Sequence, residues 1–565
     1  MPEKQTKSSL VTRFIPLLGW APHYKREWLR FDLIAGLTVA ALVVPKALGY
    51  AGIANVPIQY GLYAAAAGAI LYALFGTSRQ ISTGPSSALA AVAGSAVLLA
   101  GLSGDDEAVT LVAAITFVTG ILFLLLALFK MGWISQFLSK AVITGFLFGA
   151  AIEVVIGELP KITGTKTQGT NSWQELSSWF GSLPDTDGTT LLVGLVSLVV
   201  IFGLRRVAPR IPGALVLVIG GLAASAAFGL GDRGLALVGD VPRGLPSLAL
   251  PNFEYVIKNM PVIGAASIGL LLIGFSQSAG DARAFASKHR YRVDIDQEAV
   301  AQGMANVGSG LVQGIPVSTS LSASSLNDTS GAKTPIASLT TGALIILTLL
   351  FLAPLFSALP KAVLAAIIIE AVIMGMMDVP EMRRLYRVAR VDLWIAIAAI
   401  LGVLSSGVLA GVMIGIFLSL GWLIFISATP QMLVLGRQPG TQAFRGVKDH
   451  PDSEIYPGLL VLRFDAGLFF ASADALEDQL RNFYHKADPP LHTVVLDFEG
   501  VNFIDSQGSE KVSEILYLAR SAEIELRLAR VKTSVKELLE RDGVIDRLGE
   551  SQIYDNIYEA TVDKI

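Results

Sequence analysis

Two short segments rich in hydroxyl side chains each join a Gly and a Pro to the start of an expected helix. They cover residues 77–87 and 314–325. The N-terminus of a helix offers unpaired N–H groups and the positive end of the helix dipole, and both attract anions. Hydroxyl groups can also donate hydrogen bonds to an oxyanion. The two segments therefore predict an anion-binding site with these candidate ligands: Thr83, Gly84, Ser86, Ser318, Thr319, Ser320 and Ser322.

Plainer interpretations of the same two segments stay open. Each segment could be an ordinary Gly/Pro loop, in which Ser82 or Thr83 caps the following helix and Pro85 lies in its first turn. Small side chains such as serine also let helices pack closely in a membrane. Packing and anion binding could use different faces of one helix.

A lysine lies inside the apolar run 33–51. Placing a charged side chain in the middle of a spanning helix costs at least about 2.5 kcal/mol, so such residues are functional by default. Lys46 therefore predicts a cation for the anion site, and Tyr50, four residues later, lies on the same helix face and could offer its hydroxyl. Alternatively, Lys46 extends toward the membrane surface and Tyr50 is an interfacial aromatic residue.

Four further polar residues are candidates for the anion site or for a coupling ion. Gln277 and Asp281 are four residues apart, on one helix face, and Asp281 could bind a proton or sodium. It could equally lie at a helix end, paired with Arg283 or Lys288. Glu153 and Glu370 lie inside apolar runs, where carboxylates mark proton paths or form polar contacts between helices.

The whole composition points to a chain that lies mostly in a bilayer. Of the 565 residues, 53% are hydrophobic and 16% are charged, whereas soluble proteins carry about 25% charged residues. A spanning helix needs about 20 apolar residues. About fourteen candidate spans follow: 33–51, 60–76, 85–100, 109–129, 137–157, 189–204, 212–230, 259–279, 298–313, 320–330, 335–353, 360–377, 392–409 and 411–428.

The third and tenth of these spans are short, and they are the ones that follow the two hydroxyl-rich segments. They occupy matching positions if spans one to seven and eight to fourteen are inverted repeats. Interrupted segments at matching positions of two halves are the best sequence pointer to a transport site. We therefore predict an all-α membrane protein with a seven-plus-seven inverted repeat and two half-helices that face each other.

The distribution of positive charge predicts the orientation. Lys and Arg are more frequent in the loops that lie inside if the N-terminus is cytoplasmic. An even number of spans then returns the C-terminal part to the cytoplasm, and membrane lipid surrounds the spans. We predict a multi-pass protein of the plasma or inner membrane, with a cytoplasmic segment 1–31 and a transport domain 32–430.

Several other classes of protein are disfavoured. The chain has no cysteine and a net charge of −3, so thiolate chemistry is excluded and nucleic-acid binding has no support. Its five histidines are scattered, and no nucleophile–base pair is apparent. We expect no cofactor and no enzyme activity.

Residues 438–565 have the composition of a soluble domain. Strands are expected at 459–464, 493–498 and 524–529, alternating with helices at 473–484, 507–520 and 534–541. This pattern indicates a small α/β unit, and it contains no GxGxxG or P-loop motif. Asp505 or Ser506 is expected to cap the second helix.

The motifs also resemble a known family. Asp32–Thr38, Pro45–Ala51, Gly61–Tyr63 and Phe75–Arg79, followed by Gln297-Glu298, Gly303–Asn306 and Gly331–Thr334, resemble the blocks of the SulP (sulfate permease) family in the same order. Asp497-Phe498 and Asp505–Gly508 resemble a STAS domain, in whose soluble relatives the residue matching Ser506 is phosphorylated. The resemblance implies fourteen spans in two inverted repeats, homodimers, an elevator-like motion and anion substrates such as sulfate, bicarbonate, chloride or dicarboxylates.

This sequence departs from the family pattern at three positions. Lys46 stands where the family usually has Gln, and Ser322-Ala323 stands where it often has Ser-Arg. Gln277 stands where a carboxylate is common. The fixed positive charge of the tenth helix is therefore missing, and Lys46 is the residue expected to replace it.

The resulting prediction is a secondary active anion transporter, coupled to protons or sodium or working by exchange. A passive anion channel on the same fold is the first alternative. A nucleobase carrier and a membrane-tethered signalling module are further alternatives, which the STAS-like domain and the number of spans disfavour.

Overall fold

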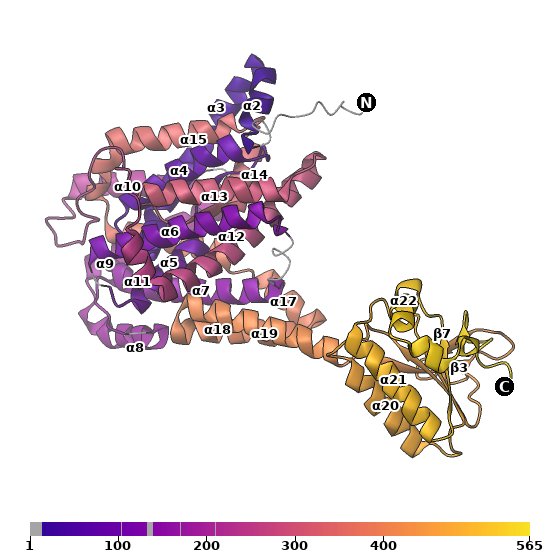
Figure 1. Cartoon of the computed structure of the whole chain (residues 1–565). Coiled ribbons are helices and arrows are strands. Elements are labelled where there is room, and N and C mark those ends of the chain that lie inside the picture. Colours follow the sequence, from indigo (N-terminus) through magenta and orange to yellow (C-terminus); the bar gives the residue numbers. More distant parts are fainter. Residues whose placement is uncertain (1–13, 103, 133–138, 170, 209–210) are drawn as a thin grey trace. The chain divides into compact units, whose positions relative to one another are not determined.

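The computed structural model describes residues 14–102, 104–132, 139–169, 171–208 and 211–565. The chain divides into two compact units, with the boundary between Ser419 and Leu420, inside the helix that ends the first unit. The first unit is almost entirely helical, and the second contains a β-sheet flanked by helices (Figure 1).

The helices of the first unit cover most of its length. Its first elements are α2 (Leu17–Trp20), the 3₁₀ turns Ala21–His23 and Arg26–Trp28, α3 (Leu29–Ile53), α4 (Gln59–Phe75), α5 (Ser87–Leu99), α6 (Asp105–Leu128), α7 (Lys140–Thr163), α8 (Ser172–Ser182), the 3₁₀ turn Leu183–Asp185, α9 (Gly188–Val207) and α10 (Gly213–Phe228). The later elements are α11 (Phe253–Lys258), α12 (Met260–His289), α13 (Ile295–Leu311), α14 (Leu321–Thr329), α15 (Ile336–Leu347), a π-helical turn (Thr348–Leu352), a 3₁₀ segment (Ala353–Ala358), α16 (Lys361–Met376), α17 (Val379–Val388), α18 (Arg390–Ser406) and α19 (Val408–Ala428).

Each of the fourteen ranges predicted to cross the membrane coincides with a helix in the described part of the chain; residues 137 and 138 of the fifth range lie outside that part. Among the described residues, eight helices are long and apolar enough to span a bilayer. The short helices α8, α11 and α17 were not predicted. Their short length hides them from a search for long apolar runs.

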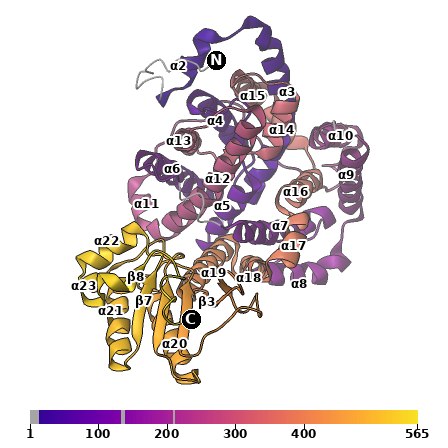
Figure 2. The ribbon, with the colours of Figure 1, turned by 90° about the vertical axis from the view of Figure 1, so that its right-hand side faces the viewer.

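The helices of the first unit form two groups. A core group contains α3 to α6 and α12 to α15, in which α13 packs against both α4 and α6. A scaffold group contains α7, α9, α10, α16 and α18, in which α16 packs against α7 and α9. In Figure 2, α3, α5 and α14 lie between α4, α6 and α13 on one side and α9, α10 and α16 on the other.

Two three-residue strands interrupt the helices of the core group. The strand β1 (Thr83–Pro85) comes directly before α5, and β2 (Val317–Thr319) comes directly before α14. The strands pair antiparallel, with Gly84 opposite Ser318. All six residues are buried. Irregular backbone at membrane depth is tolerated where it is buried in protein or lines a cavity, and here the two strands satisfy part of each other's hydrogen bonding.

Close packing of α3 against α4 depends on one glycine. A Cβ atom added at Gly61 would lie 2.0 Å from the carbonyl oxygen of Ala47. Any larger residue would therefore push α4 away from α3 at the turn that carries Lys46. Pro45, inside α3, lacks an N–H and so weakens the helix ladder at the same turn.

The second unit contains a six-stranded sheet with the order β4-β3-β5-β6-β7-β8. Its elements are β3 (Met432–Arg437), β4 (Phe444–Gly446), β5 (Leu459–Phe464), α20 (Ala473–Lys486), β6 (Thr493–Asp497), α21 (Ser506–Ser521), β7 (Glu525–Ala529), α22 (Thr533–Arg541), α23 (Val544–Leu548), a 3₁₀ turn (Glu550–Gln552) and β8 (Ile553–Tyr554). The strands β5 to β8 are parallel, and β3 is antiparallel to both of its neighbours.

The helices of this unit cover one face of the sheet, where Leu476, Ile515 and Leu539 share a core with strand residues. The C-terminal residues Ile557 and Ala560 cover the other face. The buried Arg527 guanidinium bonds Asp563 and the Ala560 carbonyl, with Nη1 2.5 Å from the Asp563 Oδ1. This contact lowers the pKa of Asp563 to about 2, so the ion pair persists above that pH.

Candidate functional site

The antiparallel pairing of β1 and β2 brings the N-termini of two half-helices to one place. Ser86 precedes α5 and Ser320 precedes α14, both with extended backbone angles. The contact continues beyond the strands, since the Ser320 N–H donates to the Ser82 carbonyl at 3.0 Å and the Ser82 N–H donates to the Ser324 hydroxyl at 2.9 Å. This arrangement agrees with the prediction that segments 77–87 and 314–325 lie against each other.

A small cavity lies at this crossing, between the half-helices and α3. Its volume is about 20 Å³, which is room for about one water molecule. The lining includes Lys46 and Tyr50 from α3, Gly84 from β1, and Ser320 and Ala323 from α14. A positive charge, hydroxyl groups and helix N-termini thus surround one space, and all of them favour an anion.

Lys46 points across the crossing. Its ammonium group donates to the Ser322 hydroxyl at 3.4 Å, and the Ser322 hydroxyl lies 3.2 Å from that of Ser320. The alternative that Lys46 extends along α3 to the membrane surface does not fit this contact. Tyr50 is buried, one turn further along α3, and lines the same cavity.

Three of the predicted ligands turn their side chains away from the cavity. The Thr83 hydroxyl accepts from the Gln302 amide at 3.1 Å, and the Ser318 hydroxyl lies 3.3 Å from that of Ser278. The Thr319 hydroxyl donates to Asp281. These side chains brace the strands against α12 and α13, while their backbones remain at the crossing.

Three predicted ligands lie near the crossing but are not among the residues that line the cavity: Ser322, described above, and Ser86 and Gln277. Ser86 is the N-cap residue of α5, and its side chain makes no capping hydrogen bond. Gln277 lies on α12, and its side-chain oxygen is buried without a hydrogen-bond partner in the described part of the chain.

Asp281 is not at a helix end, as one of the two interpretations of the sequence expected. Helix α12 continues to His289, and Lys288 pairs with Asp328 at 2.7 Å. Asp281 accepts a 2.7 Å hydrogen bond from Thr319, at the end of β2. The expectation of a terminal Asp281–Lys288 pair is therefore wrong, because α12 continues for about three turns beyond its apolar run.

The other two carboxylates belong to the scaffold group. Glu370 on α16 pairs with Arg205 on α9 at 2.5 Å, which fits a polar contact between helices. Glu153 on α7 lines a separate cavity of about 230 Å³, which Glu175 also lines. One oxygen of Glu153 is buried and has no partner among the described residues.

A polar ladder on α13 was not predicted from the sequence. Glu298, Gln302 and Asn306 are four residues apart, so they share one helix face, and each is at most 1% exposed. Glu298 accepts from the Thr77 N–H at 2.8 Å, Gln302 reaches Thr83, and Asn306 bonds both the N–H and the carbonyl of Val317. The ladder holds β1 and β2 together. The ladder could have been predicted from the sequence, because three polar residues recur at four-residue spacing inside an expected span.

In the second unit, Asp505 caps α21 by accepting from the Gly508 N–H at 2.8 Å. This confirms one of the two predicted caps. Ser506 follows as the first residue of α21 and is exposed.

Comparisons with known proteins identify the family to which the chain belongs. A model of the sulfate permease family matches residues 29–399. A probable sulfate transporter of Mycobacterium tuberculosis is 33% identical over 544 residues, which cover 95% of this chain and 96% of that protein. This chain belongs to the sulfate permease family. This confirms the predicted family. It also confirms the prediction that the chain is a multi-pass membrane transporter and not an enzyme.

Further matches include the C-terminal part of this chain. A STAS domain model matches residues 450–560, which confirms the predicted domain type. The chloroplastic sulfate transporter 4.1 of Arabidopsis thaliana is 29% identical, over 97% of this chain and 82% of that protein.

Two solved structures share the fold. The murine solute carrier 26 family member A9, an anion transporter in its inward-facing state, superposes with a TM-score of 0.90 at 22% identity and covers 100% of this chain and 96% of that chain. The transmembrane domain of a cyanobacterial bicarbonate transporter has a TM-score of 0.59 at 22% identity and covers 70% of this chain and 99% of that domain. The predicted fold class, a mostly helical transmembrane domain followed by a STAS domain with a β-sheet and helices, is confirmed.

Proposed function

We propose that this sulfate permease family member is a secondary active transporter that carries a small oxyanion, sulfate or bicarbonate, across the cell membrane. The observation that carries the proposal is the meeting of two half-helix N-termini at a cavity that Lys46 also lines. Transporters place their substrate sites near the bilayer midplane, where such broken helices meet. The relatives named as sulfate transporters and the bicarbonate transporter domain support the choice of anions.

Lys46 is the principal cation of the proposed site. Its contact with Ser322 places the ammonium group beside the N-terminus of α14. Ser320 and Ser322 supply hydroxyl donors, and Gly84 and Ser86 lie where the backbone N–H groups of α5 begin. Because the cavity holds about 20 Å³, binding of an oxyanion requires α3 and the half-helices to separate slightly.

Asp281 is the proposed coupling residue. It lies on α12 and is linked through Thr319 to the strand that leads into α14. A proton or sodium ion on Asp281 would change the hydrogen bond that holds Thr319, so the ion and the anion site are connected through one residue. Glu370 is a weaker candidate, because Arg205 already neutralises it.

The remaining parts of the proposal follow the charge pattern and the resemblance. Both termini lie in the cytoplasm, the chain forms homodimers, and the core group moves against the scaffold group during transport. The STAS domain regulates or supports this assembly.

Uptake into proteoliposomes tests the proposal. Labelled sulfate and labelled bicarbonate are offered with an inward proton gradient, a sodium gradient or no gradient. Accumulation of one anion above equilibrium under one gradient is the expected result. Equilibration without accumulation under every gradient would instead indicate a channel or an exchanger, and chloride on the opposite side would separate these two.

A further inference from the structure

A second, larger cavity lies at the membrane face predicted to be outside. Its volume is about 620 Å³. It is lined where α3, α5 and α7 end and where α4, α6 and α16 begin. These ends belong to loops that the charge pattern places outside, so the cavity is a vestibule through which an external anion would enter.

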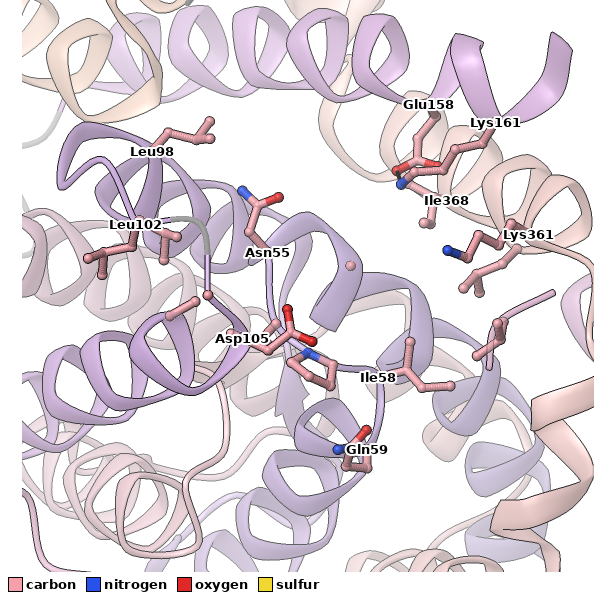
Figure 3. Close-up of a pocket in the computed structure, with 18 of the residues that line it drawn as sticks. Asn55, Ile58, Gln59, Leu98, Leu102, Asp105, Glu158, Lys161, Lys361 and Ile368 are labelled. Atoms are coloured by element: carbon pink, nitrogen blue, oxygen red, sulfur yellow. Dashed lines mark hydrogen bonds and ion pairs between the residues drawn. The ribbon is translucent and has the colours of Figure 1, made fainter. Parts of the chain in front are cut away.

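The vestibule has one wall from each helix group. Asn55, Gln59 and Asp105 belong to the core wall, and Glu158 and Lys361 belong to the scaffold wall (Figure 3). In Figure 3, the Lys361 side chain points into the cavity from the same wall as Glu158, while Asp105 lies on the opposite wall.

Some charged side chains that line the vestibule form ion pairs, and others do not. Lys161 pairs with Glu158 at 2.6 Å, so these two charges neutralise each other. Lys361 has no carboxylate oxygen within 4.0 Å of its ammonium group in the described part of the chain. Asp105 and Asp240 also line the cavity and also lack such a partner there. Lys361 is thus the one lining cation, among the described residues, whose charge is open to a ligand.

Lys361 also lies on α16, which packs against α3, the helix that carries Lys46 and Tyr50. Lys361, Leu364 and Ile368 line the vestibule from one face of α16, and Ile368 lies about 10 Å along the helix from Lys361. A Cβ atom at Gly49 would lie 2.8 Å from Ile368 Cγ1, so Ile368 packs directly on α3. The next residue on α3, Tyr50, lines the anion site. Ile368 thus lines the vestibule and packs on the part of α3 that leads to Tyr50.

We propose that the vestibule is a second anion-binding station, in which Lys361 holds a small oxyanion before it passes Ile368. The Gln59 amide on the core wall can donate to the same ion. Asp105 and Asp240 keep the station weak by repulsion, and a station on a transport path must release its ion as well as attract it. This inference rests on the proposed function, since it concerns the route to the same site.

Charge rescue at position 361 tests the role of Lys361. Because the chain has no cysteine, the variant Lys361→Cys carries a single thiol. Uptake of labelled sulfate and bicarbonate by intact cells is measured before and after treatment with membrane-impermeant cationic or anionic methanethiosulfonate reagents. We expect Lys361→Cys to raise the apparent KM on the order of tenfold at unchanged Vmax, since charge in a cleft concentrates ions by roughly this factor or more. The cationic reagent should restore the KM, and the anionic reagent should raise it further.

A matched control uses Lys258, which follows the seventh predicted span and so lies on the predicted outer side, and which is not among the vestibule residues. Lys258→Cys with the same reagents should leave the KM unchanged. An unchanged KM in Lys361→Cys, or a fall in Vmax that neither reagent reverses, would overturn the proposal, because a purely structural lysine would behave in that way.

A labelling experiment separates this inference from the proposed function, because it needs no transport. The thiol of Gln59→Cys is labelled with the anionic reagent in the presence and absence of sulfate or bicarbonate. We expect one of the two anions to slow labelling, and the additional change Lys361→Gln to abolish this protection. Protection without any uptake by the unaltered chain would contradict the proposed function alone, and uptake without protection by either anion would contradict the station alone.

Discussion

The two half-helices that meet at the proposed anion site are equivalent in position but differ in chemistry. Helix α5 is made of small apolar residues, and every residue from Ser87 to Val97 is buried. Helix α14 contains Ser322, Ser324 and Ser325, and only three of its nine residues are buried. The N-cap side chain of α14 makes a capping bond, whereas that of α5 makes none.

This difference teaches which half of the site recognises the anion. The α5 side offers mainly backbone N–H groups, held in place by dense packing, and its hydroxyl groups at this end are those of Ser86 and Ser87. The α14 side adds hydroxyl groups, the contact from Lys46 and, through Thr319, the carboxylate of Asp281. We therefore expect recognition and coupling to depend mainly on side chains around α14, and α5 to act as a fixed backbone platform.

The largest effect is expected from breaking the link that fixes both halves. Asn306→Leu removes two hydrogen bonds to Val317 and leaves a buried N–H and a buried carbonyl unpaired. Each unpaired group costs about 1–3 kcal/mol, so β2 should leave its register. Uptake per membrane-inserted protein should fall to background, and Asn306→Asp, which keeps the acceptor, should be intermediate. Uptake by Asn306→Leu close to that of the unaltered chain would refute the role of the ladder.

The next effect concerns coupling. Asp281→Asn keeps an oxygen for the Thr319 hydroxyl but removes the carboxylate charge. Gradient-driven accumulation should be lost, while exchange of labelled for unlabelled anion continues. Glu153→Gln is the matched variant on the scaffold side and should still accumulate anion. The opposite result, with accumulation lost only in Glu153→Gln, would move the coupling site to the scaffold group.

The smallest effect on transport is expected from single substitutions that compare the two half-helices directly. Ser322→Ala removes a hydroxyl near Lys46 and should raise the apparent KM about fivefold, the value of one hydrogen bond of about 1 kcal/mol. Ser86→Ala removes a side chain without a capping bond and should change the KM less than twofold, about 0.4 kcal/mol. Equal effects of the two changes on the KM of uptake would show that the halves contribute alike.

Local patterns were enough to predict the long apolar helices and the meeting of the two hydroxyl-rich segments. Long apolar runs mark spans, and Gly/Pro/Ser clusters mark the interruptions. The direction of each hydroxyl was not predictable, because it depends on partners on α12 and α13 that are distant in the sequence. Thr83, Ser318 and Thr319 therefore face those helices, and Asp281 faces β2 rather than a terminal lysine.

Two other features were hidden for different reasons. The strand β3 (Met432–Arg437) follows closely on the apolar α19, so its residues do not stand apart from the membrane sequence. Glu298, Gln302 and Asn306 are spaced so that they share one helix face. The partners of Glu298 and Gln302 lie more than 200 residues away in the sequence, and the partner of Asn306 lies across the turn that follows α13. Sequence spacing shows that such residues share a face and does not show what they hold.

Equilibrium binding tests the central claim, that the anion lies between the two half-helix N-termini beside Lys46. Labelled sulfate or bicarbonate, whichever is transported, is bound to the purified full-length chain and to two variants. Lys46→Arg keeps the charge and should bind within about threefold of the unaltered chain, while Lys46→Gln should weaken binding at least about tenfold, or 1.4 kcal/mol. Binding of the anion by Lys46→Gln as tight as that of the unaltered chain would contradict the account.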